Sequence, residues 1–153
     1  MSNHSYFFFC LAILFSSVAV GQKKTLLSKS TTEKIVIDGK FNEASWASAD
    51  IAKDFVMIEP DNGKPIAEGK RTEVKIIYDN SAIYIAATLY DDEPSKILSE
   101  FTLRDDFAVA DHFGVLLNGY NDGQQEFRFF VSAAGVQQDG VYTETYGEDF
   151  SWD

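Results

Sequence analysis

Near its centre the chain reads Thr72-Glu73-Val74-Lys75-Ile76-Ile77-Tyr78, then Asp79-Asn80-Ser81, then Ala82-Ile83-Tyr84-Ile85-Ala86-Ala87-Thr88-Leu89-Tyr90. The first segment alternates in polarity, which predicts a strand with Val74, Ile76 and Tyr78 on one face. The middle segment consists of residues that favour turns. The last segment is apolar on both faces, as expected of a central strand. Residues 72–90 are therefore predicted to form a β-hairpin.

A second hairpin is predicted further along the chain. Its strands are expected at 113–117 and 126–131, with Asn121-Asp122-Gly123 between them. Asp-Gly favours a hairpin because glycine tolerates the positive φ that such turns need. The second strand alternates between an apolar and a polar face, interrupted by Phe130. The apolar face carries Phe127, Phe129 and Val131, and the polar face carries Glu126, Arg128 and Ser132.

The remaining elements are shorter. We expect strands at 34–38, 54–58 and 136–145, and a helical turn within 41–49. Asn42 is placed to cap that turn and Trp46 to serve a structural role within it. Short strands at regular spacing, without a long amphipathic helix or an internal repeat, favour a sandwich or a barrel. The predicted fold is all-β, an antiparallel β-sandwich.

The chain begins with a predicted signal peptide, residues 1–21. An uncharged apolar run is followed by small residues ending at Ala19-Val20-Gly21, which is typical of a cleavable leader. The run is shorter than the roughly 20 residues of a membrane span. An uncleaved anchor is the alternative, because Lys23 and Lys24 follow the run. We expect export to the periplasm, the outer membrane or the cell surface.

The rest of the chain is expected to form one domain after a short tail. Residues 22–33 are polar and predict an N-terminal tail, and residues 34–153 form the predicted domain. Residues 148–153 contain neither a closing turn nor a polar tail, so we expect the domain to be incomplete there. Cys10 is the only cysteine and lies in the leader, which predicts a mature domain without a disulfide.

The charge balance excludes some partners. The chain has 24 acidic and 13 basic residues, a formal net charge of −11. Nucleic acid is excluded as a partner because phosphate contacts need clustered Lys and Arg. Docking on anionic lipid through a basic patch is disfavoured for the same reason. The acidity either keeps an exported protein soluble or supplies carboxylates to a divalent cation.

The sequence contains no convincing catalytic motif. It lacks a GxSxG elbow, an HExxH motif, a phosphate loop and a usable cysteine nucleophile. Outside the leader the only histidine is His112, which has no visible partner base or second ligand. We therefore expect this part of the protein not to be an enzyme, and leave open whether a longer polypeptide is one.

Acidic residues gather in two predicted loops. Asp91-Asp92-Glu93 follows a strand, and Asp105 and Asp106 shortly precede Asp111. Ca²⁺ takes six to eight oxygen ligands in flexible geometry, so Asp105, Asp106 and Asp111 are candidate calcium ligands. The alternative is a solvated acidic face, because no EF-hand spacing is present.

Aromatic side chains supply the candidate ligand platform. Trp152 and Tyr146 lie in a polar, turn-rich region, and Trp and Tyr rings can stack on sugars through a flat apolar face with a polar edge. Arg104 is a candidate hydrogen-bond donor to sugar hydroxyls. Burial of Trp152 in a core is the alternative.

Several motifs resemble those of family 9 carbohydrate-binding modules. Ile35-Val36-Ile37-Asp38-Gly39 and then Asn42-Glu43-Ala44-Ser45-Trp46 are similar to their opening, with Asn42 where aspartate is usual. Residues 71–90 are similar to their first hairpin. Four further segments resemble the N-terminal modules of large Gram-negative envelope proteins, namely Arg104-Asp105-Asp106, Ala110 to Val115, Tyr120 to Gly123, and Gly135-Val136-Gln137 with Asp139.

The resemblance implies a fold and a set of functions. Family members are β-sandwiches that bind sugar chains between two tryptophans and hold Ca²⁺, and the envelope modules precede a region thought to be an outer-membrane β-barrel. Three hypotheses follow: a non-catalytic module that binds a glycan or polysaccharide, a structural or gating domain of such a barrel without a sugar ligand, and an accessory module of a glycoside hydrolase in carbohydrate catabolism.

Overall fold

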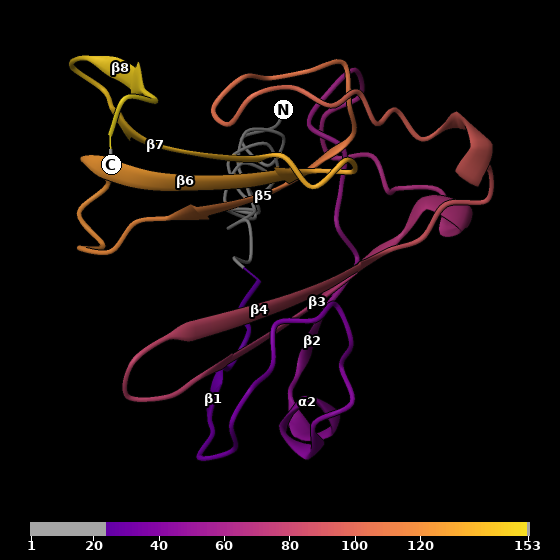
Figure 1. Ribbon diagram of the computed structural model, residues 1–153, viewed down its shortest axis with the longest axis vertical. Helices are drawn as coiled ribbons and strands as arrows, with labels where there is room; N and C mark the ends of the chain where they lie inside the picture. The colour runs from indigo at the N-terminus through magenta and orange to yellow at the C-terminus, as the bar shows by residue number, and fades with distance from the viewer. Residues whose placement is uncertain (1–23, 153) are drawn as a thin grey trace, which may run out of the picture. The chain divides into compact units, whose positions relative to one another are not determined.

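The computed structural model describes residues 24–152, which fall into two compact units. Unit 1 comprises the chain up to residue 66 together with residues 71–89, and unit 2 comprises residues 67–70 and the chain from residue 90. Each unit contains one four-stranded β-sheet (Figure 1). The described residues are mostly β with little helix, as predicted, and the pairing of the sheets in a sandwich stays a prediction.

The predicted leader, including Cys10, lies outside the described residues. Among residues 24–152, no helix is long and apolar enough to cross a membrane. Of the predicted polar tail, residues 24–33 are described, and part of this segment joins a sheet. Lys29–Ser30 forms strand β1 and pairs with a strand of unit 1, and the domain boundary at residue 33 stays a prediction.

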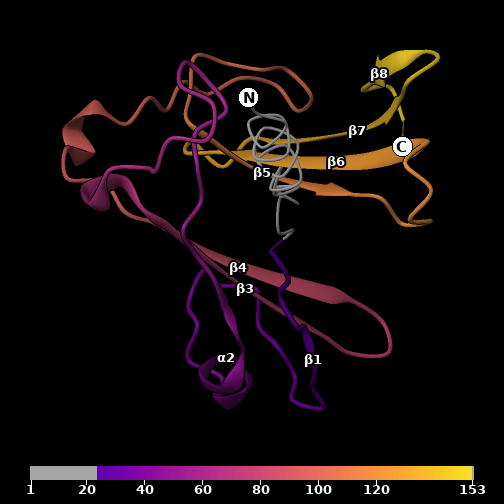
Figure 2. The same ribbon diagram turned by 180° about the vertical axis from the view of Figure 1, so that it is seen from behind.

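Unit 1 is organised around one long hairpin. Strands β3 and β4 pair antiparallel and so confirm the predicted hairpin, with a register that runs from Thr72 opposite Leu89 to Tyr78 opposite Ile83. The short strands β1 and β2 both pair with the other edge of β3 (Figure 1). Figure 2 shows the β3–β4 hairpin from behind. The elements of this unit are β1 (Lys29–Ser30), α2 (Ala44–Ser48), β2 (Ile51–Ala52), β3 (Thr72–Tyr78) and β4 (Ile83–Leu89).

The central strand is therefore β3, and the prediction that the second strand of the hairpin is central was wrong. Among the described residues, β4 pairs only with β3. Its apolar residues include Ile83 and Leu89, which are both more than half exposed. The apolar residues on both faces of β4 therefore did not indicate a central position in the sheet, because several of them are not buried.

The main core cluster of unit 1 lies on the face of β3 that carries Ile77, although Val74 on the predicted face is also buried. Ile77 is 1% exposed and packs with Ile35, Trp46, Ala49 and Ala86. Tyr78, predicted to share a buried face with Val74, is 43% exposed. The reason for the difference is the position of α2, which contributes Trp46 to the same cluster as Ile77. The structural role of Trp46 is confirmed by its burial.

Helix α2 is capped from a distance and not by Asn42. The residue at its N-cap position is Glu43, which makes no side-chain capping bond. The Glu33 carboxylate instead accepts hydrogen bonds from the backbone N–H of Ala44 (3.3 Å) and of Ser45 (2.9 Å). A hydrogen bond from the Ser45 hydroxyl is the main cause that lowers the pKa of Glu33. The predicted Asn42 cap was wrong because a long-range carboxylate satisfies these donors.

Two predicted strands of unit 1 are absent as such. Residues 34–38 are irregular, and of their apolar side chains only Ile35 is buried. The strand expected at 54–58 is reduced to an isolated bridge between Val56 and Pro65, and the neighbouring pair Ile51–Ala52 forms β2 instead. Ile51–Ala52 forms a strand because it pairs with β3, and such pairing outweighs the intrinsic β-propensity of a short apolar segment.

The turn of the hairpin is held by Asp79. Its Oδ1 accepts hydrogen bonds from the backbone N–H of Ser81 (2.7 Å) and Ala82 (2.8 Å), and its Oδ2 accepts one from the Tyr84 hydroxyl (2.8 Å). These bonds, the one from the Ser81 N–H foremost, lower the pKa of Asp79 to about 2. The ionised carboxylate thus fixes the turn that sets the register of β3 and β4.

Asp79→Asn should consequently destabilise the protein at neutral pH and much less in acid. The pKa of the folded state lies below the ~3.9 of an unfolded aspartate, so the stabilisation is present above about pH 4 and is lost as the pH falls towards 2. Urea unfolding of wild type and variant at several pH values measures this. A difference between the two that stayed constant from pH 7 to pH 2.5 would contradict it.

Unit 2 is an antiparallel meander. Its strands follow the order β5-β6-β7-β8, which confirms the predicted second hairpin. Strand β8, paired with the end of β7, was not predicted because it is only three residues long. The elements of this unit are η1 (Glu68–Lys70), η2 (Pro94–Lys96), β5 (His112–Leu117), β6 (Gln125–Ser132), β7 (Gln137–Thr143) and β8 (Gly147–Asp149).

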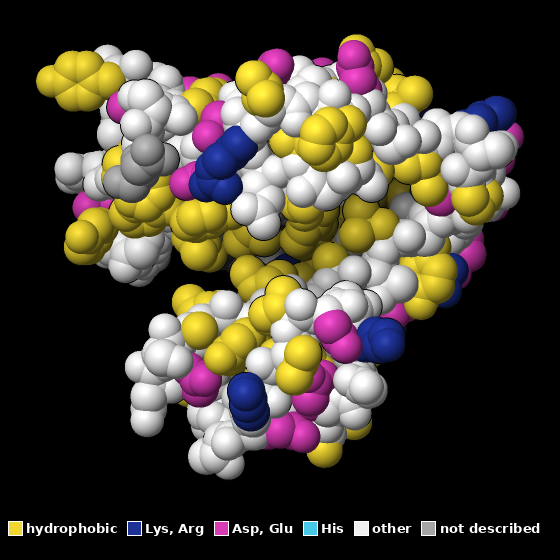
Figure 3. Space-filling view, viewed as in Figure 1, with side chains coloured by type: hydrophobic (Ala, Val, Ile, Leu, Met, Phe, Trp, Pro, Cys, Tyr) yellow, Lys and Arg dark blue, Asp and Glu magenta, His cyan; other side chains and the backbone are white. Residues whose placement is uncertain are grey.

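Large apolar side chains reach the surface in both units (Figure 3). The buried apolar residues among those described all belong to unit 1. In unit 2 the predicted apolar face of β6 is present but only partly covered, with Phe129 41% and Val131 40% exposed. Aromatic packing stabilises the other face, where Phe107 makes edge contacts with His112, Phe130 and Phe150 at 5.2 to 5.7 Å between ring centroids.

Candidate functional site

The candidate site is built on the turn that joins β7 to β8. Strand β7 ends at Thr143, which lies opposite Gly147, the first residue of β8. Gly147 has a φ of 77°, a conformation that glycine adopts without a steric penalty. The Tyr146 N–H donates a hydrogen bond to the Thr143 hydroxyl (3.2 Å) and closes the turn. This arrangement leaves the Tyr146 side chain 88% exposed to solvent.

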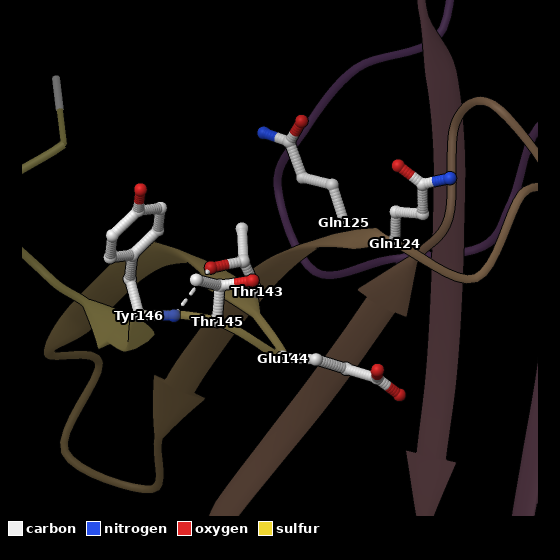
Figure 4. Close-up of a pocket in the computed structure, with 6 residues that line it drawn as sticks. All are labelled: Gln124, Gln125, Thr143, Glu144, Thr145 and Tyr146. Carbon is white, nitrogen blue, oxygen red and sulfur yellow. Dashed lines mark hydrogen bonds between the residues drawn. The ribbon is translucent and has the colours of Figure 1, made fainter.

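The beginning of β6 supplies the second side of the site. Gln125 lies directly opposite Thr143 in the β6–β7 register, and Gln124 precedes it. Together the two segments line an open groove of about 370 Å³ (Figure 4). Its lining residues are Gln124, Gln125, Thr143, Glu144, Thr145 and Tyr146.

The groove contains an aromatic ring among polar groups. In Figure 4 the Tyr146 ring and the Glu144 carboxylate extend in opposite directions from the turn, with the threonine side chains between them. The glutamine amides both donate and accept hydrogen bonds, as do the hydroxyls, whereas an ionised carboxylate only accepts. Such a set suits a ligand with one apolar ring face and many hydroxyls.

The described residues that line this groove do not include the carboxylate pair of a glycosidase. A glycosidase needs two carboxyl groups that flank the scissile bond, and Glu144 is the one carboxylate that lines it. His112 lies elsewhere and packs edge-on against Phe107. The described lining residues therefore offer groups that can bind and orient a ligand.

The three predicted sugar-binding residues are not brought together. Tyr146 lines the groove, whereas Trp152 does not; its ring packs against Phe127 at 5.5 Å between centroids and is 40% exposed. Arg104 donates hydrogen bonds to Gln137 Oε1 (3.1 Å) and to Asp139. Gln137 begins β7 and Thr143 ends it, so Arg104 and the groove lie at opposite ends of that strand.

The predicted calcium ligands have separate surroundings. Asp105 has a φ of 64°, accepts a hydrogen bond from the Asp139 N–H (3.1 Å) and lies 3.3 Å from the Arg104 Nε. The Asp106 N–H and the Asp111 N–H donate to different loop carbonyls, those of Leu103 and Leu98. Within residues 24–152, no three His, Cys, Asp or Glu side chains gather closely enough to hold a metal. Calcium binding by these aspartates stays a prediction without a shared ligand set.

The other groove residues were missed in the sequence. Gln124, Gln125, Thr143, Glu144 and Thr145 belong to no motif, and none is unusual in a polar turn. The predicted hairpin at Asn121-Asp122-Gly123 and the predicted strand at 136–145 indicated which two segments carry these residues, but not that the segments lie side by side. Placing Gln125 opposite Thr143 required the exact register, which the sequence pattern does not specify at a loop of this length.

No protein-family model, curated protein or solved structure matches the chain.

Proposed function

We propose that this part of the chain is a non-catalytic binding module that engages a glycan through the groove at the β7–β8 turn. The observation that carries the proposal is the 88% exposed Tyr146 ring in a groove otherwise lined by amides, hydroxyls and one carboxylate. A tyrosine side chain loses little conformational entropy when it contacts a ligand, and its ring offers a flat apolar face. The amides of Gln124 and Gln125 supply donors and acceptors for sugar hydroxyls.

The resemblance to family 9 carbohydrate-binding modules supports the same proposal. In this proposal the two sheets are the layers of a family 9-like β-sandwich, and the protein is exported to the cell envelope. The ligand platform then differs from the family pattern, because Tyr146 takes the place of a tryptophan pair. Calcium binding and an outer-membrane barrel on the same polypeptide remain parts of the proposal that rest on the resemblance alone.

A structural role in the envelope is the second candidate. It is favoured by the exposed apolar residues of the segment that precedes β5 in unit 2. Phe101 is 79% and Leu103 81% exposed, and apolar side chains of this size at the surface are typical of contacts with another protein or domain. Glycan binding and such a contact use different residues, so the two candidates can be tested separately.

Tyr146→Ala should reduce glycan affinity about tenfold or more, which is the usual effect of removing an aromatic anchor from an interface. A glycan array on the full chain identifies a neutral glycan, and calorimetry measures its affinity for wild type and variant. Tyr120→Ala is the matched control, because Tyr120 is 73% exposed in the same unit but does not line the groove. Equal losses in both variants would contradict the assignment of the groove, and no binding to any glycan would favour the structural role.

A further inference from the structure

The net charge of the protein is confined to one unit. Unit 1 contains nine basic and nine acidic residues, whereas unit 2 contains four basic and 15 acidic residues, which gives it the whole formal charge of −11. The groove belongs to unit 2. Any ligand of the groove therefore approaches a strongly negative surface, and the energy of that approach depends on the charge of the ligand.

The basic side chains of unit 2 are already neutralised. Each one lies within 4 Å of at least one carboxylate, so an anionic ligand finds no unpaired cation in the described part of this unit. The pairs are Lys70 with Asp91 and Asp92, Lys96 with Glu93, Arg104 with Asp105 and Asp139, and Arg128 with Glu126 and Glu148.

Glu144 is the charged group of the groove itself. It is exposed, and its side chain makes no hydrogen bond or ion pair with any other described residue. In Figure 4 it lies across the turn from the Tyr146 ring. A sugar chain stacked on Tyr146 must therefore extend over the turn for another of its residues to reach the Glu144 carboxylate.

We infer, on the basis of the proposed glycan binding, that the groove selects sugar chains by charge. It prefers a chain that carries protonated 2-amino groups over the same chain with hydroxyls, because the amine pairs with Glu144. It rejects chains of uronic acids, because their carboxylates meet a surface of the same sign without a free Lys or Arg.

Calorimetry of the full chain with four matched β-1,4-linked tetrasaccharides tests the inference. The tetramers are those of glucose, of glucosamine, of N-acetylglucosamine and of glucuronic acid, compared at low ionic strength and at a pH where the amines are protonated. We expect the glucosamine tetramer to bind about two- to fivefold more tightly than the glucose tetramer, the effect of one exposed ion pair. The glucuronic acid tetramer should bind about tenfold more weakly than the glucose tetramer.

Salt and substitution identify the cause. Raising the ionic strength to about 1 M, where the screening length is ~3 Å, should abolish the preference for the amine. Glu144→Gln should lower the affinity ratio of the glucosamine and glucose tetramers at low salt by the contribution of one ion pair, and acetylation of the amines should bring the ratio to about one. Glu59→Gln is the matched control, an exposed residue of unit 1, and should leave the ratio unchanged.

The outcomes separate the inference from the proposed function. If the glucose tetramer binds but the glucosamine tetramer binds no better, or if Glu144→Gln leaves the affinity ratio unchanged, the charge selection is wrong and glycan binding stands. Tight binding of the glucuronic acid tetramer would also overturn the inference. If none of the tetramers binds and the glycan array is empty, the proposed function itself fails.

Discussion

Ile77→Ala should be among the most destabilising single substitutions in the chain, with an expected loss of about 2–5 kcal/mol in the free energy of unfolding. Ile77 is 1% exposed and belongs to the core cluster that also contains Trp46. Its removal leaves a cavity among residues from α2, β3 and β4, which cannot close it without moving the hairpin. Urea unfolding followed by tryptophan fluorescence measures the loss.

Ile83→Ala is the matched control for this prediction. Ile83 lies in the same hairpin, one register pair from Ile77, but is 60% exposed. Its substitution should change the free energy of unfolding by about 0.5 kcal/mol or less, as surface substitutions usually do. Similar losses in the two variants would mean that the core does not lie on the Ile77 face of β3.

Gly140→Ala should destabilise unit 2 by about 1–3 kcal/mol, the range for forced overpacking. A Cβ at this position would lie 2.7 Å from the Asp149 carbonyl oxygen and 2.7 Å from the Phe150 ring. The first contact is with backbone, so β8 must move away from β7. Since the turn between these strands carries Tyr146, the groove should change together with stability.

Gly119→Ala tests whether this effect is specific. The nearest atom to a Cβ at Gly119 belongs to the Phe127 ring at 3.7 Å, an ordinary contact. This variant should therefore unfold within about 0.5 kcal/mol of wild type. Thermal unfolding of both variants provides the comparison, and a Gly140→Ala protein as stable as wild type would contradict the close approach of β7 and β8.

The hairpins were predictable because they depend on local patterns. Alternation over 72–78, the turn residues after it and Asp-Gly at 122–123 define elements through near neighbours. The positions of strands within the sheets depended on distant partners. The central place of β3 follows from its pairing with β1 and β2, and the cap of α2 from Glu33, and neither pairing leaves a local pattern.

The site was less predictable than the fold. Tyr146 could be selected as an aromatic residue in a polar turn, but Trp152 and Arg104 have the same kind of polar surroundings. What separates them is tertiary contact, namely the packing of Trp152 on Phe127 and the engagement of Arg104 by Asp139. The partners of Tyr146 across the groove follow from the register of β6 with β7, which no residue type encodes.

The most direct test of the account is to locate a bound glycan by nuclear magnetic resonance. Titration of the full chain with a neutral oligosaccharide, followed through backbone and side-chain amide shifts, reports which residues the ligand contacts. We predict that the largest shifts fall on the side-chain amides of Gln124 and Gln125 and on the backbone of residues 143–146. Shifts centred on Trp152 or Arg104, or no shifts with any glycan, would contradict the assignment of this groove as the binding site.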